Sequence, residues 1–128
     1  MPTWLEVQEY ARTRYRLAED FEAGFKVIWR YDNDRSQQIV VSRARALGRE
    51  WCRFASPACR SGQLPAEVAL RRSAAFPVGS LILDGDIYVV VHSLLLVTMH
   101  FEEFDLLLNL VASTADQIEA EFAGVDQF

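Results

Sequence analysis

Residues that usually carry chemistry are scarce in this chain of 128 residues. It has two cysteines and two histidines, and it contains neither a Gly-rich phosphate loop nor a Gly-x-Ser-x-Gly motif. Cys52 and Cys59 are too few for a disulfide framework, and their spacing fits no zinc or redox motif. His92 and His100 have no converging acids or thiols beyond the two glutamates close to His100. We therefore expect a protein that is not an enzyme and needs no metal and no cofactor.

Long apolar runs are absent as well. The longest, residues 87–99, is interrupted by His92, Ser93 and Thr98 and is too short to span a bilayer. The first residues, "MPTWLEVQEYARTR", lack the basic segment and apolar core of an export signal. We expect a cytoplasmic protein with reduced thiols that does not associate with membranes.

Positive charge is missing from the C-terminal part of the chain. Residues 73–128 hold nine acidic residues and no lysine or arginine, a net charge of −9. Residues 1–72 hold thirteen basic and nine acidic residues, a net charge of +4, and twelve of the thirteen are arginine. The total of −5 argues against nucleic acid as a partner.

What is present is the composition of a globular domain. Hydrophobic residues make up 51% and charged residues 24% of the chain, which predicts one folded domain over residues 1–128. Hydrophobic spacing predicts helices at 3–21, 66–74 and 101–122, and strands at 25–31, 36–47, 49–56 and on both sides of Asp84-Gly85. This order predicts an α+β fold, with an antiparallel five-stranded sheet and helices on one face, in the order α-β-β-β-α-β-β-α.

The stretch "VGSLILDGDIYVVVH", residues 78–92, is typical of a β-hairpin. Asp84-Gly85 is a common two-residue hairpin turn and predicts that Leu83 lies opposite Asp86. One face then carries Leu81, Leu83, Tyr88 and Val90, and the other carries Val78, Ile82, Ile87, Val89 and Val91. Since a sheet with one wet face should alternate apolar and polar residues, we expect a partner, a ligand or a second subunit on the second face. A thick monomer core is the alternative.

The surface expected to bind that partner lies on the first two predicted strands. Apolar residues alternate on one side of the first strand, and one side of the second strand passes from apolar to cationic. The predicted partner-binding residues are Val27, Trp29, Tyr31, Ile39, Val41, Arg43 and Arg45. Trp29 and Tyr31 are the expected anchors, because aromatic side chains dominate binding hot spots. For the two arginines, a solvated strand end is the alternative.

Residues 64–124, "LPAEVALRRSAAFPVGSLILDGDIYVVVHSLLLVTMHFEEFDLLLNLVASTADQIEAEFAG", combine a short helix, a strand–turn–strand and a long acidic helix. Together with the preceding helix and strands, this order resembles the type III secretion chaperone and YbjN-like superfamily. The resemblance implies a small, acidic, cytoplasmic and commonly dimeric protein that binds extended segments of client proteins. Our leading hypothesis is therefore a non-enzymatic peptide-binding chaperone or adaptor, a homodimer, that uses an apolar sheet face and pairing at a strand edge.

Two other function classes stay open. The first is an immunity or regulatory inhibitor protein that caps a basic partner with the acidic residues 73–128, an interaction that salt should weaken. The second is a small enzyme or phospholigand binder in which an arginine cluster converges with Tyr31 or His92. The cluster consists of Arg43, Arg45, Arg49, Arg53, Arg60, Arg71 and Arg72.

Overall fold

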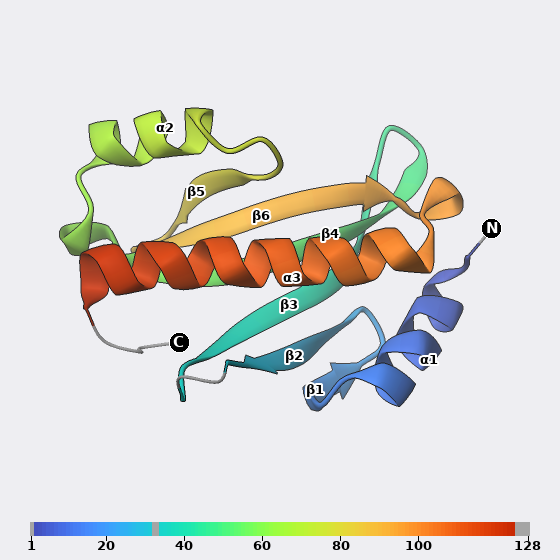
Figure 1. The fold of residues 1–128 in the computed structure, drawn as a ribbon. Coiled ribbons are helices and arrows are strands. Elements are labelled where there is room, and N and C mark those ends of the chain that lie inside the picture. Colours follow the sequence, from blue (N-terminus) through green and yellow to red (C-terminus); the bar gives the residue numbers. More distant parts are fainter. Residues whose placement is uncertain (1, 32–33, 125–128) are drawn as a thin grey trace.

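The computed structural model describes residues 2–31 and 34–124 as an α+β domain with one antiparallel six-stranded sheet (Figure 1). The strands are β1 (Leu17–Phe21), β2 (Gly24–Arg30), β3 (Ser36–Ala46), β4 (Arg49–Arg60), β5 (Ser80–Asp84) and β6 (Ile87–Leu95), in the spatial order β1-β2-β3-β4-β6-β5. The helices are α1 (Trp4–Arg14), α2 (Ala66–Ala74) and α3 (Phe101–Ile118), with a π-helical continuation η3 (Glu119–Ala123) and the short 3₁₀ helices η1 (Ser61–Gln63) and η2 (Leu96–Thr98). The α+β class and the antiparallel sheet are confirmed, whereas the expected five strands and their order are wrong.

The additional strand, β1, forms from residues that the sequence placed in the first helix. α1 starts with the predicted capping box but ends at Arg14. Phe21 then pairs with Gly24 across a two-residue turn. A side chain at Gly24 is excluded here, because its Cβ would lie 2.9 Å from the carbonyl oxygen of Val41. The glycine therefore lets β3 lie close against the start of β2, and the β1–β2 ladder satisfies backbone groups that a longer helix would have satisfied internally.

β4 continues through Pro57, although the sequence predicted that this strand ends before the proline. Proline lacks the N–H that a central strand needs, and a bulge after Pro57 accommodates it. Backbone pairing of β4 with β3 ends at Ala55, and side chains replace the ladder beyond it. Gln37 Nε2 donates to the Pro57 carbonyl oxygen at 2.5 Å and to Ser56 Oγ at 2.9 Å.

The β5–β6 hairpin turns at Gly85-Asp86 instead of Asp84-Gly85. Leu83 pairs with Tyr88, so the expected position of Leu83 opposite Asp86 is wrong. Gly85 has a φ of 64°, and no positive φ occurs at Asp86, as in a type II′ turn, which needs glycine only at its first loop position. The register differs from the expected one by two residues, so the side chains of both strands stay on their predicted faces, whereas Val78, which precedes β5, packs against the core.

α3 lies across β3, β4 and β6 (Figure 1). Its stripe of apolar residues buries Phe104, Leu108 and Val111 completely. The fully buried strand residues beneath the helices include Phe25, Val27, Ile39, Val41, Phe54 and Val90, and we call their side of the sheet the covered face. Each such side chain contributes about 1.5–3 kcal/mol by leaving water, so this interface is the main source of stability.

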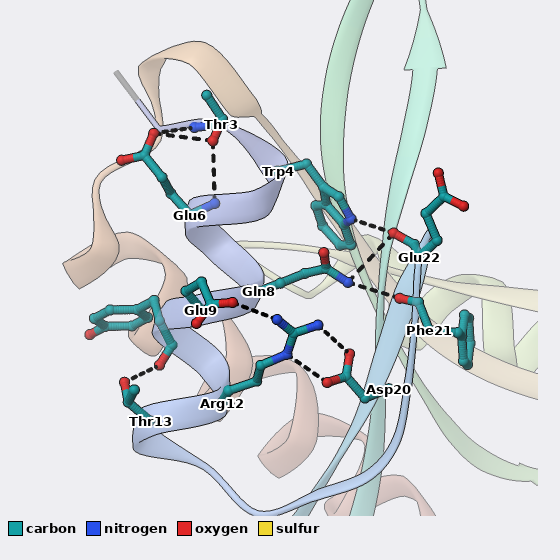
Figure 2. A network of polar contacts seen from close by, with 11 residues as sticks. Thr3, Trp4, Glu6, Gln8, Glu9, Arg12, Thr13, Asp20, Phe21 and Glu22 are labelled. Atoms are coloured by element: carbon teal, nitrogen blue, oxygen red, sulfur yellow. Dashed lines mark hydrogen bonds and ion pairs between the residues drawn. The ribbon is translucent and has the colours of Figure 1, made fainter.

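α1 is fixed to the β1–β2 turn by two buried polar side chains (Figure 2). Trp4 Nε1 donates to the Glu22 carbonyl oxygen at 2.8 Å, and Gln8 Nε2 donates to the Phe21 carbonyl oxygen at 2.8 Å. The Trp4 indole also stacks on Phe25 of the covered face, with centroids 5.7 Å apart. α1 therefore covers the β2 end of the same face on which α3 packs.

Asp105 ties the other end of α1 to α3. It accepts hydrogen bonds from the hydroxyl groups of Tyr10, at 2.5 Å, and of Tyr15, and Arg14 lies 3.5 Å from it. Burial, and then the hydrogen bond to Asp105, raise the pKa of both tyrosines. The two hydroxyl groups therefore remain neutral donors well into the alkaline range.

α2 lies beside the edge strand β5 (Figure 1). Ser73 Oγ accepts the backbone N–H of Leu81 at 2.9 Å. Arg72 pairs with Glu121 at 2.6 Å and lies over the Phe122 ring, which connects α2 to the C-terminal end of the long helix. α2 thus shields part of the β5 edge and joins the helices that surround the covered face.

Candidate binding surface on the open face of the sheet

The side of the sheet opposite the covered face is apolar at its centre, and we call it the open face. Directly paired residues of antiparallel strands point to the same side of a sheet. Val40 pairs with Ala55, and Ala55 pairs with Val91, so these three side chains form one row across β3, β4 and β6. The apolar side chains of the open face on β2 to β6 include Ile28, Val40, Ala55, Pro57, Ile82, Ile87, Val89 and Val91.

Within residues 2–31 and 34–124, α3 packs on the covered face, α1 contacts the β1–β2 turn, Phe25 of the covered face and α3, and α2 contacts β5 and η3. Ala55 is shielded by its neighbours, whereas Val40, Val89 and Val91 remain partly exposed. A sheet face that meets only water would carry polar residues at these positions. Contiguous exposed apolar surface is typical of interaction sites, and this makes the open face the candidate binding surface.

Three of the predicted partner-binding residues lie in the core instead. Val27, Ile39 and Val41 are fully buried on the covered face, so the expectation that they present uncovered sheet surface is wrong. Apolar residues alternate along the strands as predicted, but the helices cover the face that was expected to stay open. Residues 39–41 are apolar in succession, and alternation alone therefore does not tell which side of β3 a helix will cover.

Trp29 and Tyr31, the two expected anchors, lie on the helix side as well. Trp29 is partly buried and packs beside Tyr15, with ring centroids 6.0 Å apart. The Tyr31 hydroxyl lies 3.4 Å from Ser113 Oγ of α3, and burial raises the pKa of Tyr31. Both aromatic residues thus join the end of β2 to the helical layer and not to the open face.

Arg43 and Arg45 lie at the end of β3, on the helix side but beyond the core. Arg43 lies 2.8 Å and Arg45 lies 3.5 Å from Glu50. Arg43 and Glu50 also line a pocket of about 600 Å³, whose wall includes Trp4 and Leu96. The pocket has the size of a small-molecule site, but these two charged groups already neutralise each other.

The remaining arginines of the predicted cluster do not converge with Tyr31 or His92. Arg71 pairs with Glu67 on α2 at 2.8 Å, whereas Arg53 lies on the open face, paired in register with Ser42 and Ser93. This dispersal removes the support for an arginine-lined phosphate or catalytic site.

Half of the described acidic residues of 73–124 are paired with the basic half of the same chain: Asp105, Asp116, Glu119 and Glu121 form ion pairs, and Asp84, Asp86, Glu102 and Glu103 do not. Arg35 lies 2.9 Å from Asp116 and 3.1 Å from Glu119, whose side chain is fully buried, and Arg72 binds Glu121. These ion pairs leave Glu102 and Glu103 as the carboxylates of α3 that a basic partner could reach without competing with an ion pair.

Cys52 and Cys59 are buried in the core. Burial raises the pKa of Cys52 to about 12, and burial together with Glu119 raises the pKa of Cys59. A thiol held in its neutral form is a poor nucleophile. In the described part of the chain, no cluster of three or more His, Cys, Asp or Glu side chains could hold a metal ion. Among the described helices, none has the length and apolar character to cross a membrane.

Comparison with known proteins adds no family to this description: no family model matches the chain, and no curated protein matches it.

Sequence reasoning found only part of that surface. Ile82, Val89 and Val91 were predicted on the second, uncovered face of the hairpin, and they lie on the open face. Val40 and Ala55 were missed. The apolar run at residues 39–41 was the signal for Val40, because such a run is apolar on both sides of a strand.

Proposed function

We propose that this protein binds a segment of another protein on the open face, as a chaperone or adaptor without catalytic activity. The row formed by Val40, Ala55 and Val91 supports the proposal, because it places apolar side chains at the centre of a face that the chain's own helices do not cover. A client segment on this row would remove apolar surface from water, which contributes about 25 cal/mol per Å². The resemblance to the type III secretion chaperone and YbjN-like superfamily supports the same kind of partner.

Binding on the face has more support than pairing at an edge strand. At β5, the N–H of Leu81 is already bonded to Ser73. At β1, the carbonyl oxygen of Phe21 already accepts a hydrogen bond from Gln8. An inhibitor that caps a basic partner with residues 73–128 has less support, because four of the eight described acids of that half, Asp105, Asp116, Glu119 and Glu121, are already ion-paired within the chain.

The experiment is affinity capture from the cytoplasm of the source cells with three versions of the full chain. We expect the wild type to retain a client protein that Val91→Asp loses, because a carboxylate in the central row would be desolvated by the client. Leu70→Asp is the control, since Leu70 is 70% exposed on α2, away from the open face. A client that binds Val91→Asp as well as the wild type would contradict the proposal, provided circular dichroism shows that the variant is folded.

The homodimer expected from the sequence remains a prediction. Light scattering of the purified chain measures its mass, and repeating the measurement with Val91→Asp shows whether the open face contributes to self-association.

A further inference from the structure

We propose that the segment bound on the open face is acidic as well as apolar. This inference rests on the proposed function and names the chemistry of the client. Its basis is the distribution of basic side chains that the chain does not pair with its own acids.

Eight of the thirteen basic side chains lie within ion-pair distance of a carboxylate: Arg12, Arg14, Lys26, Arg35, Arg43, Arg45, Arg71 and Arg72. Among the described residues, the basic side chains without such a pair are Arg16, Arg30, Arg49, Arg53 and Arg60. A random arrangement would place these five arginines on all sides of the protein. Four of them instead belong to the strands β2 and β4, which the open face includes.

The strand register assigns these four arginines to open-face positions, and Arg49, at the end of β4, also lines the pocket beside Trp4. Arg53 pairs with Ser42 and Ser93, Arg30 with Ser36, Arg49 with Ala46 and Arg60 with Ile87, all positions that alternate with covered-face residues. Among the described strand residues, the acids in the same register are Glu19 and Asp84, and Glu19 already lies 3.4 Å from Lys26. The open face is therefore positively charged, although the whole chain carries −5.

Arg53 connects the charge to the apolar centre. It lies two residues from Ala55 on β4, a separation of about 7 Å along a strand. A client with a carboxylate next to an apolar side chain could place the first at Arg53 and the second on the central row. A guanidinium beside an apolar surface binds a carboxylate through charge-assisted hydrogen bonds, which are stronger than those between neutral groups.

Two other occupants fit this face less well. A second copy packed face to face would bring its own arginines against these, and like charges at an interface cost affinity. Single-stranded nucleic acid stacks on several aromatic side chains, whereas the central row of the open face is aliphatic and Trp51, at the end of β4, is the aromatic residue that the register of β3, β4 and β6 places on this face. Both occupants remain outcomes of the test.

The test compares three synthetic amphipathic helical peptides that share one leucine face and carry glutamate, glutamine or lysine on the other. Each is labelled, and its affinity for the full chain is measured by fluorescence anisotropy at low and at high salt. We expect the glutamate peptide to bind at least about tenfold more tightly than the lysine peptide at low salt, with the difference shrinking as salt screens the arginines.

The variant Arg53→Gln should bring the affinity for the glutamate peptide close to that for the glutamine peptide. The matched control is Arg45→Gln, which removes the same charge from the helix side of the neighbouring strand, where Arg45 is 67% exposed, and should leave the preference unchanged. Thermal melts of both variants check that they are folded.

Each other outcome has a defined meaning. Equal or tighter binding of the lysine peptide overturns the acidic preference and leaves client binding on the open face intact. Failure of all three peptides to bind contradicts the proposed function itself. Tighter binding of an oligodeoxythymidine probe, lost in Arg53→Gln, would replace the acidic client by nucleic acid, and dimerisation that is lost in Val91→Asp would replace it by a second copy.

Discussion

The covered and open faces belong to the same strands and share the same kinds of apolar residue, but among the described elements only the covered face is packed against α3. Val90 is fully buried on the covered face, whereas Val91, the next residue of β6, is partly exposed on the open face. On the first face, apolar side chains specify the fold, because α3 is present to bury them. On the second face they are in excess of what folding needs, and this excess is the evidence for a partner.

The strongest test of this difference between the two faces is to place a carboxylate on each side of β6. We expect Val90→Asp to lose at least about 4 kcal/mol of unfolding free energy and to be largely unfolded, because an unpaired carboxylate would lie in the core. Val91→Asp should lose less than about 1 kcal/mol, because its carboxylate remains in water. Urea unfolding of both variants measures the difference, and similar losses would contradict the assignment of the faces.

A smaller effect is expected from the ion pair beneath the end of α3. Arg35→Ala leaves the fully buried carboxylate of Glu119 without this partner, and we expect a loss of about 3 kcal/mol. Arg71→Ala is the matched control, because its pair with Glu67 is exposed on α2 and should contribute little. Comparable melting temperatures for the two variants would show that the Arg35 pair is not important for stability.

Alkaline pH should lower the free energy of unfolding through ionisation of Cys52, which is buried in the core. The folded chain holds the Cys52 proton up to a pKa of about 12, above the usual 9.0. Its contribution to stability is therefore complete below about pH 9 and falls by about 1.4 kcal/mol per pH unit as pH rises from 9 towards 12. Cys52→Ala should reduce this decline in urea unfolding between about pH 9 and pH 10, and Cys59 and the tyrosines whose pKa values are also raised account for the part that remains. An unchanged slope would mean that Cys52 is not the responsible group.

The smallest expected effect is a difference in stability between the variants Trp4→Phe and Trp51→Phe. Trp4→Phe keeps the stacking on Phe25 but removes the buried hydrogen bond to Glu22, at an expected cost of about 1 kcal/mol. In Trp51→Phe, the lost bond to the Ala46 carbonyl oxygen is exposed, so water can replace it and stability should hardly change. Equal costs in thermal melts would indicate that burial of the Trp4 bond does not matter.

Local patterns in the sequence predicted most elements, but not their assembly. The helix at 66–74 and the start of α3 at Phe101 agree with the structure, because capping residues and periodicity are local signals. Gln8 of α1 holds the end of β1 at Phe21, and Gln37 replaces the ladder where β4 passes through Pro57, and no local pattern encodes these contacts. The predicted site was misplaced for the same reason, because tertiary packing determines which face of the sheet α3 covers.

The attachment of Leu81 to Ser73 also bears on how this chain behaves at high concentration. An exposed edge of a sheet can recruit the edge of another molecule and grow into fibres. Here a serine hydroxyl occupies an outward N–H of β5, and α2 lies beside that strand. This protection of the β5 edge lowers the tendency of the chain to polymerise strand by strand at high concentration.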